Sequence, residues 1–194
     1  MNPQLMATDE ELMDGVAGGE ALAFDQLLER HGKPLFNFFL RQVGNVTEAE
    51  DLVQTTFVRI LQAAPSFDPA QKFTTWAYRI AHNLCVDFFR RQQHRRAVSL
   101  DEPLTDDESL TLGDLMADDA PAPGLRFEDN QLQAAIRRAV TTLPVEQRAV
   151  VVLCHFEGRS YPEIAETLDI PVGTVKSRMH NAMRRLRDQL QDWM

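Results

Sequence analysis

The sequence is poor in cysteine, with only Cys85 and Cys154 among its 194 residues. Two distant cysteines cannot build a disulfide framework, and neither lies in a spacing typical of a redox or metal site. No apolar run approaches the roughly 20 residues that a membrane span needs. The acidic N-terminal segment also lacks the basic and then apolar layout of a secretory signal. We therefore expect a cytoplasmic protein that makes no direct membrane contact.

The sequence also lacks the common catalytic motifs. It contains no phosphate-binding loop, no nucleophile elbow and no paired-carboxylate site. The pairs His82-x-x-Cys85 and Cys154-His155 each offer at most two metal ligands, and their separation is not that of a zinc site. We therefore expect no enzyme activity, no cofactor and no metal.

Alternating strand patterns with hairpin turns are absent as well, which predicts an all-α fold. Thr8-x-x-Glu11 and Thr47-x-x-Glu50 have the spacing of capping boxes, and apolar residues at helical intervals follow each of them. Glycines at Gly18-Gly19 and Gly44 mark helix ends. In the N-terminal half the pattern predicts helices over residues 20–30, 33–44, 48–63 and 74–91.

Charge is distributed in blocks, although the net charge is -9. Residues 72–96 carry six basic residues against Asp87 alone, whereas residues 97–130 carry ten acidic residues against Arg126. The acidic block is also interrupted by proline and glycine, a composition that cannot bury enough apolar surface to fold alone. We therefore predict two small helical domains, residues 1–95 and 129–194, joined by a flexible acidic linker over 96–128.

The strongest local signal is a helix-turn-helix in the C-terminal domain. Ser160-x-x-Glu163 starts a short helix, Asp169-Ile170-Pro171 forms a tight connection, and a second helix begins near Val172. On that second helix Val175, Met179, Ala182 and Leu186 share one side. The residues available to base edges and phosphates are Thr174, Lys176, Ser177, Arg178, His180, Asn181 and Arg184. The alternative is a basic surface helix that only caps a bundle.

The helix over residues 48–62 also has two contrasting sides. Its apolar stripe consists of Ala49, Leu52, Val53, Phe57 and Ile60. The opposite side presents Glu48, Asp51, Gln54, Thr55, Val58 and Arg59. An apolar Val58 among short polar groups favours a protein interface, and the alternative is an ordinary solvated helix face.

The stretch from Phe67 to Arg91 interleaves aromatic and basic residues, which is the pattern of single-stranded nucleic-acid binding. Trp76, Ile80 and Leu84 share one helix side and are expected in the core, whereas Tyr78 and His82 face another way and are the better candidates for contact. The alternative is that every aromatic residue in this stretch is used for packing.

These motifs together resemble the bacterial sigma factors. EAEDLVQTTFVRI (Glu48–Ile60) and FTTWAYRIAHNLCVDFFRR (Phe73–Arg91) resemble sigma region 2. The run LPVEQRAVVVLCHFEGRSYPEIAETLDIPVGTVKSRMHNAMRRLR (Leu143–Arg187) resembles region 4. With only these two regions and a short linker, the chain is similar to the extracytoplasmic-function (ECF) sigma factors.

The resemblance implies a partner for each surface. The RNA polymerase core would bind through the clamp helices of its β′ subunit, at Glu48, Asp51, Gln54, Thr55 and Val58, and also through its β subunit. Region 4 would bind the minus-thirty-five element of promoter DNA. The linker would follow the RNA path of the polymerase, and an anti-sigma factor is expected. The minus-ten element would be bound by Ser66, Phe67, Lys72, Phe73, Thr74, Thr75, Tyr78, Arg79 and His82.

One departure from the family pattern concerns the second helix of the helix-turn-helix. Many relatives carry Arg at the positions of Asn181 and Met183, so the preferred minus-thirty-five sequence does not carry over. Two other hypotheses remain: a helix-turn-helix regulator that binds duplex DNA without polymerase, and an adaptor that binds proteins alone.

Overall fold

The computed structural model describes residues 7–98 and 126–191, and every regular element in these ranges is a helix. The N-terminal domain consists of α1 (Asp9–Ala17), α2 (Ala21–Val43), α3 (Val46–Ala63), the short 3-10 helix η1 (Ala64–Ser66) and α4 (Phe73–Val98). The C-terminal domain consists of α5 (Arg126–Thr142), α6 (Val145–His155), α7 (Tyr161–Leu168) and α8 (Val172–Gln189). The predicted linker lies almost wholly outside the described residues.

Local sequence signals account for most helix ends. The Thr8 hydroxyl accepts from the Glu11 backbone N–H at 3.1 Å, and the Glu11 carboxylate accepts from the Thr8 N–H at 2.8 Å. This capping box is confirmed, but the one predicted at Thr47 is wrong. Asn45 caps α3 instead, because its side-chain oxygen accepts from the Glu48 N–H at 3.0 Å. Gly44 has a φ of 76°, the left-handed conformation that ends α2.

The two helices predicted over residues 20–30 and 33–44 are one continuous helix, α2, which runs through Pro34. Proline removes one backbone hydrogen bond and crowds the preceding turn, which normally ends or kinks a helix. Here the next residues, Leu35, Phe38 and Phe39, are fully buried. Their burial stabilises the helix on the far side of the proline by more than the proline destabilises it.

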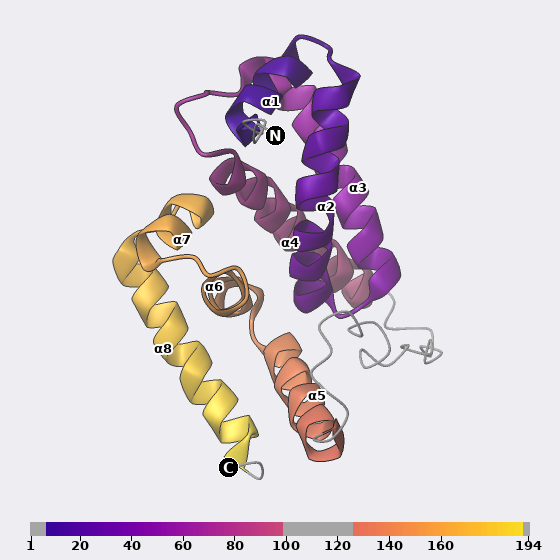
Figure 1. The fold of residues 1–194 in the computed structure, drawn as a ribbon. Helices are drawn as coiled ribbons and strands as arrows, with labels where there is room; N and C mark the ends of the chain where they lie inside the picture. The colour runs from indigo at the N-terminus through magenta and orange to yellow at the C-terminus, as the bar shows by residue number, and fades with distance from the viewer. Residues whose placement is uncertain (1–6, 99–125, 192–194) are drawn as a thin grey trace.

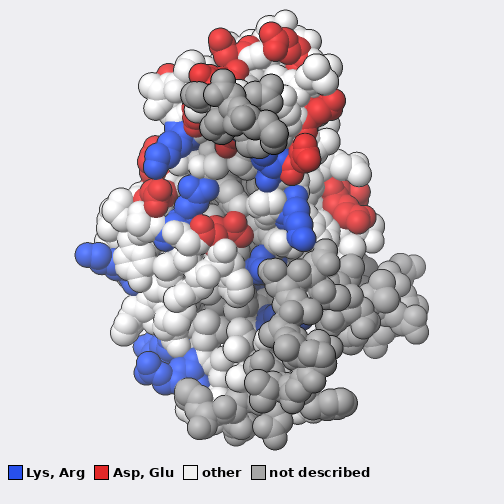
Figure 2. Space-filling view, in the orientation of Figure 1, with Lys and Arg blue, Asp and Glu red and all other residues white. Residues whose placement is uncertain are grey.

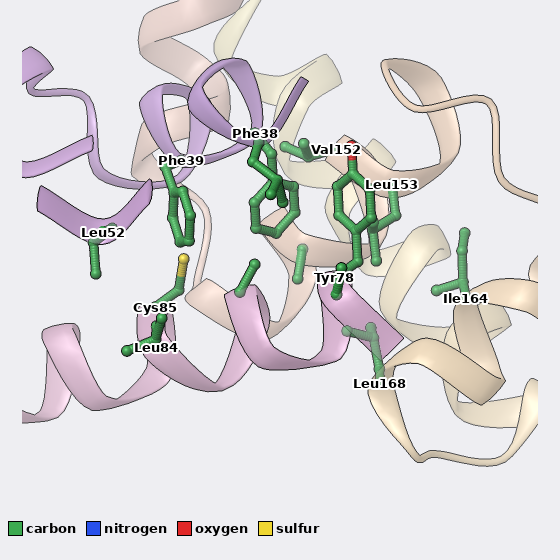
Figure 3. Packing of buried hydrophobic residues seen from close by; sticks show 14 of the residues in the cluster. Phe38, Phe39, Leu52, Tyr78, Leu84, Cys85, Val152, Leu153, Ile164 and Leu168 are labelled. Atoms are coloured by element: carbon green, nitrogen blue, oxygen red, sulfur yellow. The ribbon is translucent and has the colours of Figure 1, made fainter. Parts of the chain in front are cut away.

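The two domains pack against each other, although the sequence suggested separate bodies on a tether. Helix α7 contacts α4, and α5 and α6 contact α2. In Figure 1, α6 is seen end-on between the N-terminal bundle and α8. A single cluster of buried apolar side chains runs through both domains. Figure 3 shows Phe38 and Tyr78 of the N-terminal domain beside Val152 and Leu153 of α6.

Candidate polymerase and nucleic-acid interfaces

Helix α8 is held in place by the turn that precedes it. Ser160 and Glu163 form the predicted capping box of α7, and the resulting hydrogen bonds lower the pKa of Glu163 to about 2. Asp169 then adopts a left-handed φ of 52°, which turns the chain into α8. Val175, Met179 and Ala182 of α8 are buried as predicted, and Leu186 is partly buried. The opposite side of α8 is thereby fixed toward solvent.

The exposed side of α8 carries a concentration of basic residues. Lys176, Ser177, His180 and Arg184 are exposed, while Thr174, Arg178 and Asn181 are partly buried. Five basic residues and no acidic residue lie between Lys176 and Arg187. Figure 2 shows Lys and Arg side chains over this part of the molecule, whereas acidic side chains gather over the end that holds α1. Positive charge concentrated on one helix face is suited to binding phosphates.

The outer side of α3 is exposed as its sequence pattern predicts. Leu52, Phe57 and Ile60 are buried, and Val58 is 51% exposed on the opposite side. All five residues of the predicted polymerase-binding set, Glu48, Asp51, Gln54, Thr55 and Val58, are exposed.

A groove of about 230 Å³ continues the α3 surface onto the last turns of α4. Glu48, Asp51 and Thr55 line its α3 side, and Arg91 and Arg95 line its α4 side. Arg91 is the last basic residue of the interleaved stretch, and the structure places it beside α3, which helical periodicity alone does not reveal.

The loop between α3 and α4 opens into a second hollow of about 530 Å³, lined by Arg59, Gln62, Ala63, Ser66, Trp76 and Ile80. The ring centroids of Phe67 and Trp76 lie 5.0 Å apart, so aromatic surface forms part of this region. Trp76 and Ile80 are only partly buried, whereas the sequence predicted them in the core. Phe73 is fully buried, and its backbone N–H donates to the Glu10 carboxylate at 2.9 Å.

The other side of α4 lies beneath the C-terminal domain. Thr75, Tyr78 and His82 are buried there, with 1%, 4% and 8% of their surface exposed. Tyr78 and His82, the better candidates for contact in the sequence, therefore have almost no exposed surface in this structure. Helical periodicity separated them correctly from Leu84, but it could not show that a second domain covers them.

Polar contacts between the domains surround Tyr78. Its hydroxyl donates to the Glu157 carboxylate at 2.5 Å, and the Arg159 guanidinium lies 5.4 Å from its ring centroid. Arg159 also donates to the Thr74 hydroxyl at 3.1 Å. Burial, and then the Glu157 carboxylate, raise the pKa of Tyr78 above its ordinary value.

Basic residues at the start of α4 meet acceptors on α7. Arg79 donates to the Glu166 carbonyl at 2.7 Å, and the Lys72 ammonium lies 3.4 Å from the Glu163 carboxylate. Nearby, burial is the main cause that lowers the pKa of His82 to about 4, and the charge of Arg178 lowers it further. His82 is consequently neutral at physiological pH.

Arg148 is a buried residue that bonds to both domains, and no pattern in the sequence predicted this role. Its side chain is buried, and its guanidinium donates to the carbonyls of Gln42 in α2 and of Thr141 and Leu143 around the end of α5. It also lies 5.1 Å from the ring centroid of Phe89 in α4. Carbonyls at helix C-termini carry partial negative charge, so they stabilise this buried cation.

The cysteine pairs considered above bring no cluster of metal ligands together. Across residues 7–98 and 126–191 no group of three or more His, Cys, Asp or Glu side chains is placed to hold a metal ion. None of the helices in these ranges is long and apolar enough to cross a bilayer.

Comparison with known proteins identifies both halves of the chain. The family Sigma-70 region 2 matches residues 27–95, and the family Sigma-70, region 4 matches residues 133–186. The ECF RNA polymerase sigma factor SigW of Bacillus subtilis (strain 168) is 36% identical over 177 residues, covering 91% of this chain and 94% of SigW. The ECF RNA polymerase sigma-E factor of Escherichia coli (strain K12) is 31% identical over 191 residues, covering 98% and 97% of the two chains.

A solved structure has the same fold. CnrH, in complex with the cytosolic domain of CnrY, matches with a TM-score of 0.67 and 28% identity, covering 96% of this chain and 99% of the matched chain. A regulator that uses only a helix-turn-helix would not match region 2, so the sequence comparisons favour a sigma factor over that hypothesis. The chain belongs to the ECF sigma factors of the sigma-70 family, non-enzymatic subunits that bind core RNA polymerase and direct promoter recognition through regions 2 and 4.

Proposed function

We propose that the exposed side of α8 binds the minus-thirty-five element in the major groove. The observation that carries this proposal is the basic face of α8, which lies opposite buried Val175, Met179 and Ala182. Ser177, Asn181 and Arg184 have side chains that can reach base edges. Lys176 and Arg178 flank them and neutralise phosphates, and Thr174 and His180 complete the surface.

The outer side of α3 is the proposed contact for the β′ clamp helices. Exposed Val58 supports this assignment, because an apolar side chain among Asp51, Gln54 and Thr55 loses unfavourable hydration when a partner covers it. Glu48 extends the same surface into the groove that Arg91 lines. The β subunit of the polymerase is a further proposed partner. The proposed site of action is the cytoplasm.

The minus-ten element is proposed to bind around the loop between α3 and α4. With the two domains packed as in the structure, Ser66 and Lys72 are exposed, and Phe67, Thr74 and Arg79 are partly exposed. The hollow beside Ser66 is large enough to hold an unpaired base next to Trp76. Phe73, Thr75, Tyr78 and His82 belong to the proposed set but have almost no surface to offer DNA in this arrangement.

An inhibitory protein partner, an anti-sigma factor, is also proposed. CnrH, which has a similar fold, was solved with the cytosolic domain of CnrY, so a related structure binds a second protein. The acidic linker over 96–128 is proposed to follow the RNA path of the polymerase, since ten acidic residues between 97 and 130 suit a basic channel.

Transcription in vitro tests these assignments together. The purified chain is mixed with core RNA polymerase and a genomic promoter library, and the start sites are mapped. We expect initiation at promoters with common elements only when both components are present, because the acidic segments weaken DNA binding by the chain alone. Tight and specific duplex binding by the free chain at physiological salt would contradict the proposal and favour a stand-alone regulator.

A further inference from the structure

The loop between α3 and α4 is part of the proposed minus-ten surface, so its position on the domain matters. Several of its hydrogen bonds are local: the Ser66 hydroxyl donates to the Ala63 carbonyl, and the Ala70 N–H donates to the Asp68 carboxylate, each at 2.9 Å. Local bonds of this kind shape the loop but do not fix where it lies. Its position depends on the point where the loop joins α4, at Phe73.

The start of α4 has a backbone N–H that the adjacent sequence does not cap. The first N–H groups of a helix have no partner within the helix, and an acceptor side chain just before it commonly satisfies one of them. The residue before α4 is Lys72, whose ammonium group can only donate. Glu10 of α1 supplies the acceptor instead, since its carboxylate accepts from the Phe73 N–H at 2.9 Å. A carboxylate at this point also lies near the positive end of the α4 dipole.

Helix α1 is a fixed support for the Glu10 carboxylate. Met13, on the inner side of α1, is fully buried. The Asp9 carboxylate accepts from the Arg30 guanidinium of α2 at 3.0 Å, and it lies 2.7 Å from Nε2 of His31. Helix α1 also contacts η1 and α4, and in Figure 1 it lies at the end of the N-terminal bundle from which the loop leaves.

Phe73 connects the start of α4 to the aromatic rings of the loop. Its buried ring has its centroid 4.9 Å from that of His31, 6.4 Å from that of Phe67 and 6.2 Å from that of Trp76. Trp76 lines the hollow in which an unpaired base is proposed to bind, and Phe67 lies against it. A displacement of Phe73 would therefore move both rings.

We propose that Glu10 is a positioning residue for the minus-ten element, because its carboxylate fixes the start of α4 and with it the loop and the rings beside the hollow. This inference rests on the proposed function. Helix α1 precedes residues 27–95, which the family Sigma-70 region 2 matches. Glu10 belongs to none of the surfaces proposed to contact polymerase or DNA. Loss of its carboxylate should therefore weaken minus-ten binding and leave polymerase binding unchanged.

Holoenzymes assembled from core RNA polymerase and variant chains test this role. Glu10→Ala removes the acceptor, and Glu10→Gln keeps an amide oxygen that can accept. The matched control is Asp14→Ala, which removes an exposed carboxylate of the same helix. The probe is a fluorescently labelled single strand with the non-template minus-ten sequence of a promoter mapped by transcription in vitro.

The expected result is a loss of affinity for the single strand alone. Losing a hydrogen bond to a charged group shifts the loop away from its binding position, so Glu10→Ala should bind the strand roughly three- to tenfold more weakly than Asp14→Ala. Glu10→Gln should recover most of this loss. The affinity for core polymerase, measured by titration, should be the same for all three variants.

A second measurement reports the loop in the free chain, without DNA. The sequence contains two tryptophans, Trp76 and Trp193, so Trp193→Phe leaves only Trp76. In this background Glu10→Ala should increase the quenching of Trp76 fluorescence by acrylamide relative to Asp14→Ala, while the circular dichroism stays the same. Equal quenching in the two variants would overturn the inference.

The binding data separate failure of the inference from failure of the proposed function. If Lys72→Ala weakened strand binding but Glu10→Ala matched Asp14→Ala, the inference would be overturned and the proposed minus-ten surface would stand. An equal loss of core-polymerase affinity in Glu10→Ala would also overturn the inference, because the residue would then only stabilise the domain. If neither Lys72→Ala nor Glu10→Ala weakened strand binding, the proposed surface would be refuted, and the inference with it.

Discussion

Replacement of Arg148 by methionine should destabilise the protein strongly, although Met is of similar length and suits a buried position. Arg148 is 6% exposed, and burial lowers the pKa of its guanidinium. No carboxylate in the described part of the chain is paired with it. Its partners are the backbone carbonyls of Gln42, Thr141 and Leu143.

The magnitude follows from what methionine leaves behind. Each buried carbonyl without a donor costs about 1–3 kcal/mol. Relief from burying a charge offsets part of the loss, because desolvating an ion costs several kcal/mol. We expect Arg148→Met to lower the free energy of unfolding by about 3 kcal/mol, the lower end of the range for removing one partner of a buried ionic contact.

Arg148→Lys separates the role of charge from that of shape. Nη1 of Arg148 donates to Gln42 of the N-terminal domain, while Nη2 donates to Thr141 and Leu143 of the C-terminal domain. A single ammonium group cannot occupy both positions. We therefore expect Arg148→Lys to lower the free energy of unfolding by about 2 kcal/mol, although the variant keeps the positive charge.

The assay is urea unfolding followed by circular dichroism, with the slope of the free energy against urea checked for each variant. Arg138→Met is the matched control, because Arg138 is exposed on α5 and its loss should change the free energy of unfolding by less than about 0.5 kcal/mol. If Arg148→Met matched this control, or if Arg148→Lys matched the parent chain, the bridging role of the guanidinium would be refuted.

Three further predictions concern the two exposed surfaces and the interface. Val58→Asp should weaken binding to core polymerase without loss of helicity, whereas Leu22→Asp, at an exposed apolar position of α2, should not; a titration with labelled chain measures both. Asn181→Ala should cost about 1–3 kcal/mol at one base pair of the minus-thirty-five element, whereas Lys176→Ala should weaken holoenzyme binding to all promoters and lower the salt slope by about one. If Asn181→Ala and Lys176→Ala both weakened holoenzyme binding equally at all promoters, the assignment of Asn181 to bases and Lys176 to phosphates would be contradicted. His82 has its pKa lowered from 6.5 to about 4, so the unfolded chain binds more protons between these values and stability falls as the pH drops. Between pH 7 and pH 5 the protonation of this group should lower the free energy of unfolding by about 2 kcal/mol. His82→Gln should flatten the dependence of the free energy of unfolding on pH, whereas the same change at an exposed histidine should not.

Features that depend on residues close in sequence were predictable. The capping boxes at Thr8 and Ser160 are present, because each involves a side chain and a backbone group three residues apart. The buried side of α8 was predictable for the same reason, since Val175, Met179 and Ala182 recur at helical spacing. Pro34 marks where this kind of reasoning fails, because the burial of distant neighbours decides whether the helix continues.

Features that depend on contacts between the domains were not predictable. Tyr78 and Glu157 are 79 residues apart in the chain, and no local pattern links them. Arg148 resembles any arginine in the first turns of an amphipathic helix, yet it lies in the interior and bonds to both domains. Periodicity assigns a side chain to one face of a helix, but the element that covers that face depends on the tertiary structure.

The pattern on α4 shows why a nucleic-acid surface and a protein interface are difficult to distinguish in a sequence. Aromatic rings and basic groups bind unpaired bases and phosphates, but they bind carboxylates and carbonyls equally well. In the structure Lys72 lies near the Glu163 carboxylate, Arg79 donates to a carbonyl of α7, and the Tyr78 hydroxyl donates to Glu157. The C-terminal domain thus presents acceptors where DNA would present phosphates. The same residue composition that predicted DNA binding therefore also allows the chain to cover this surface with its own second domain.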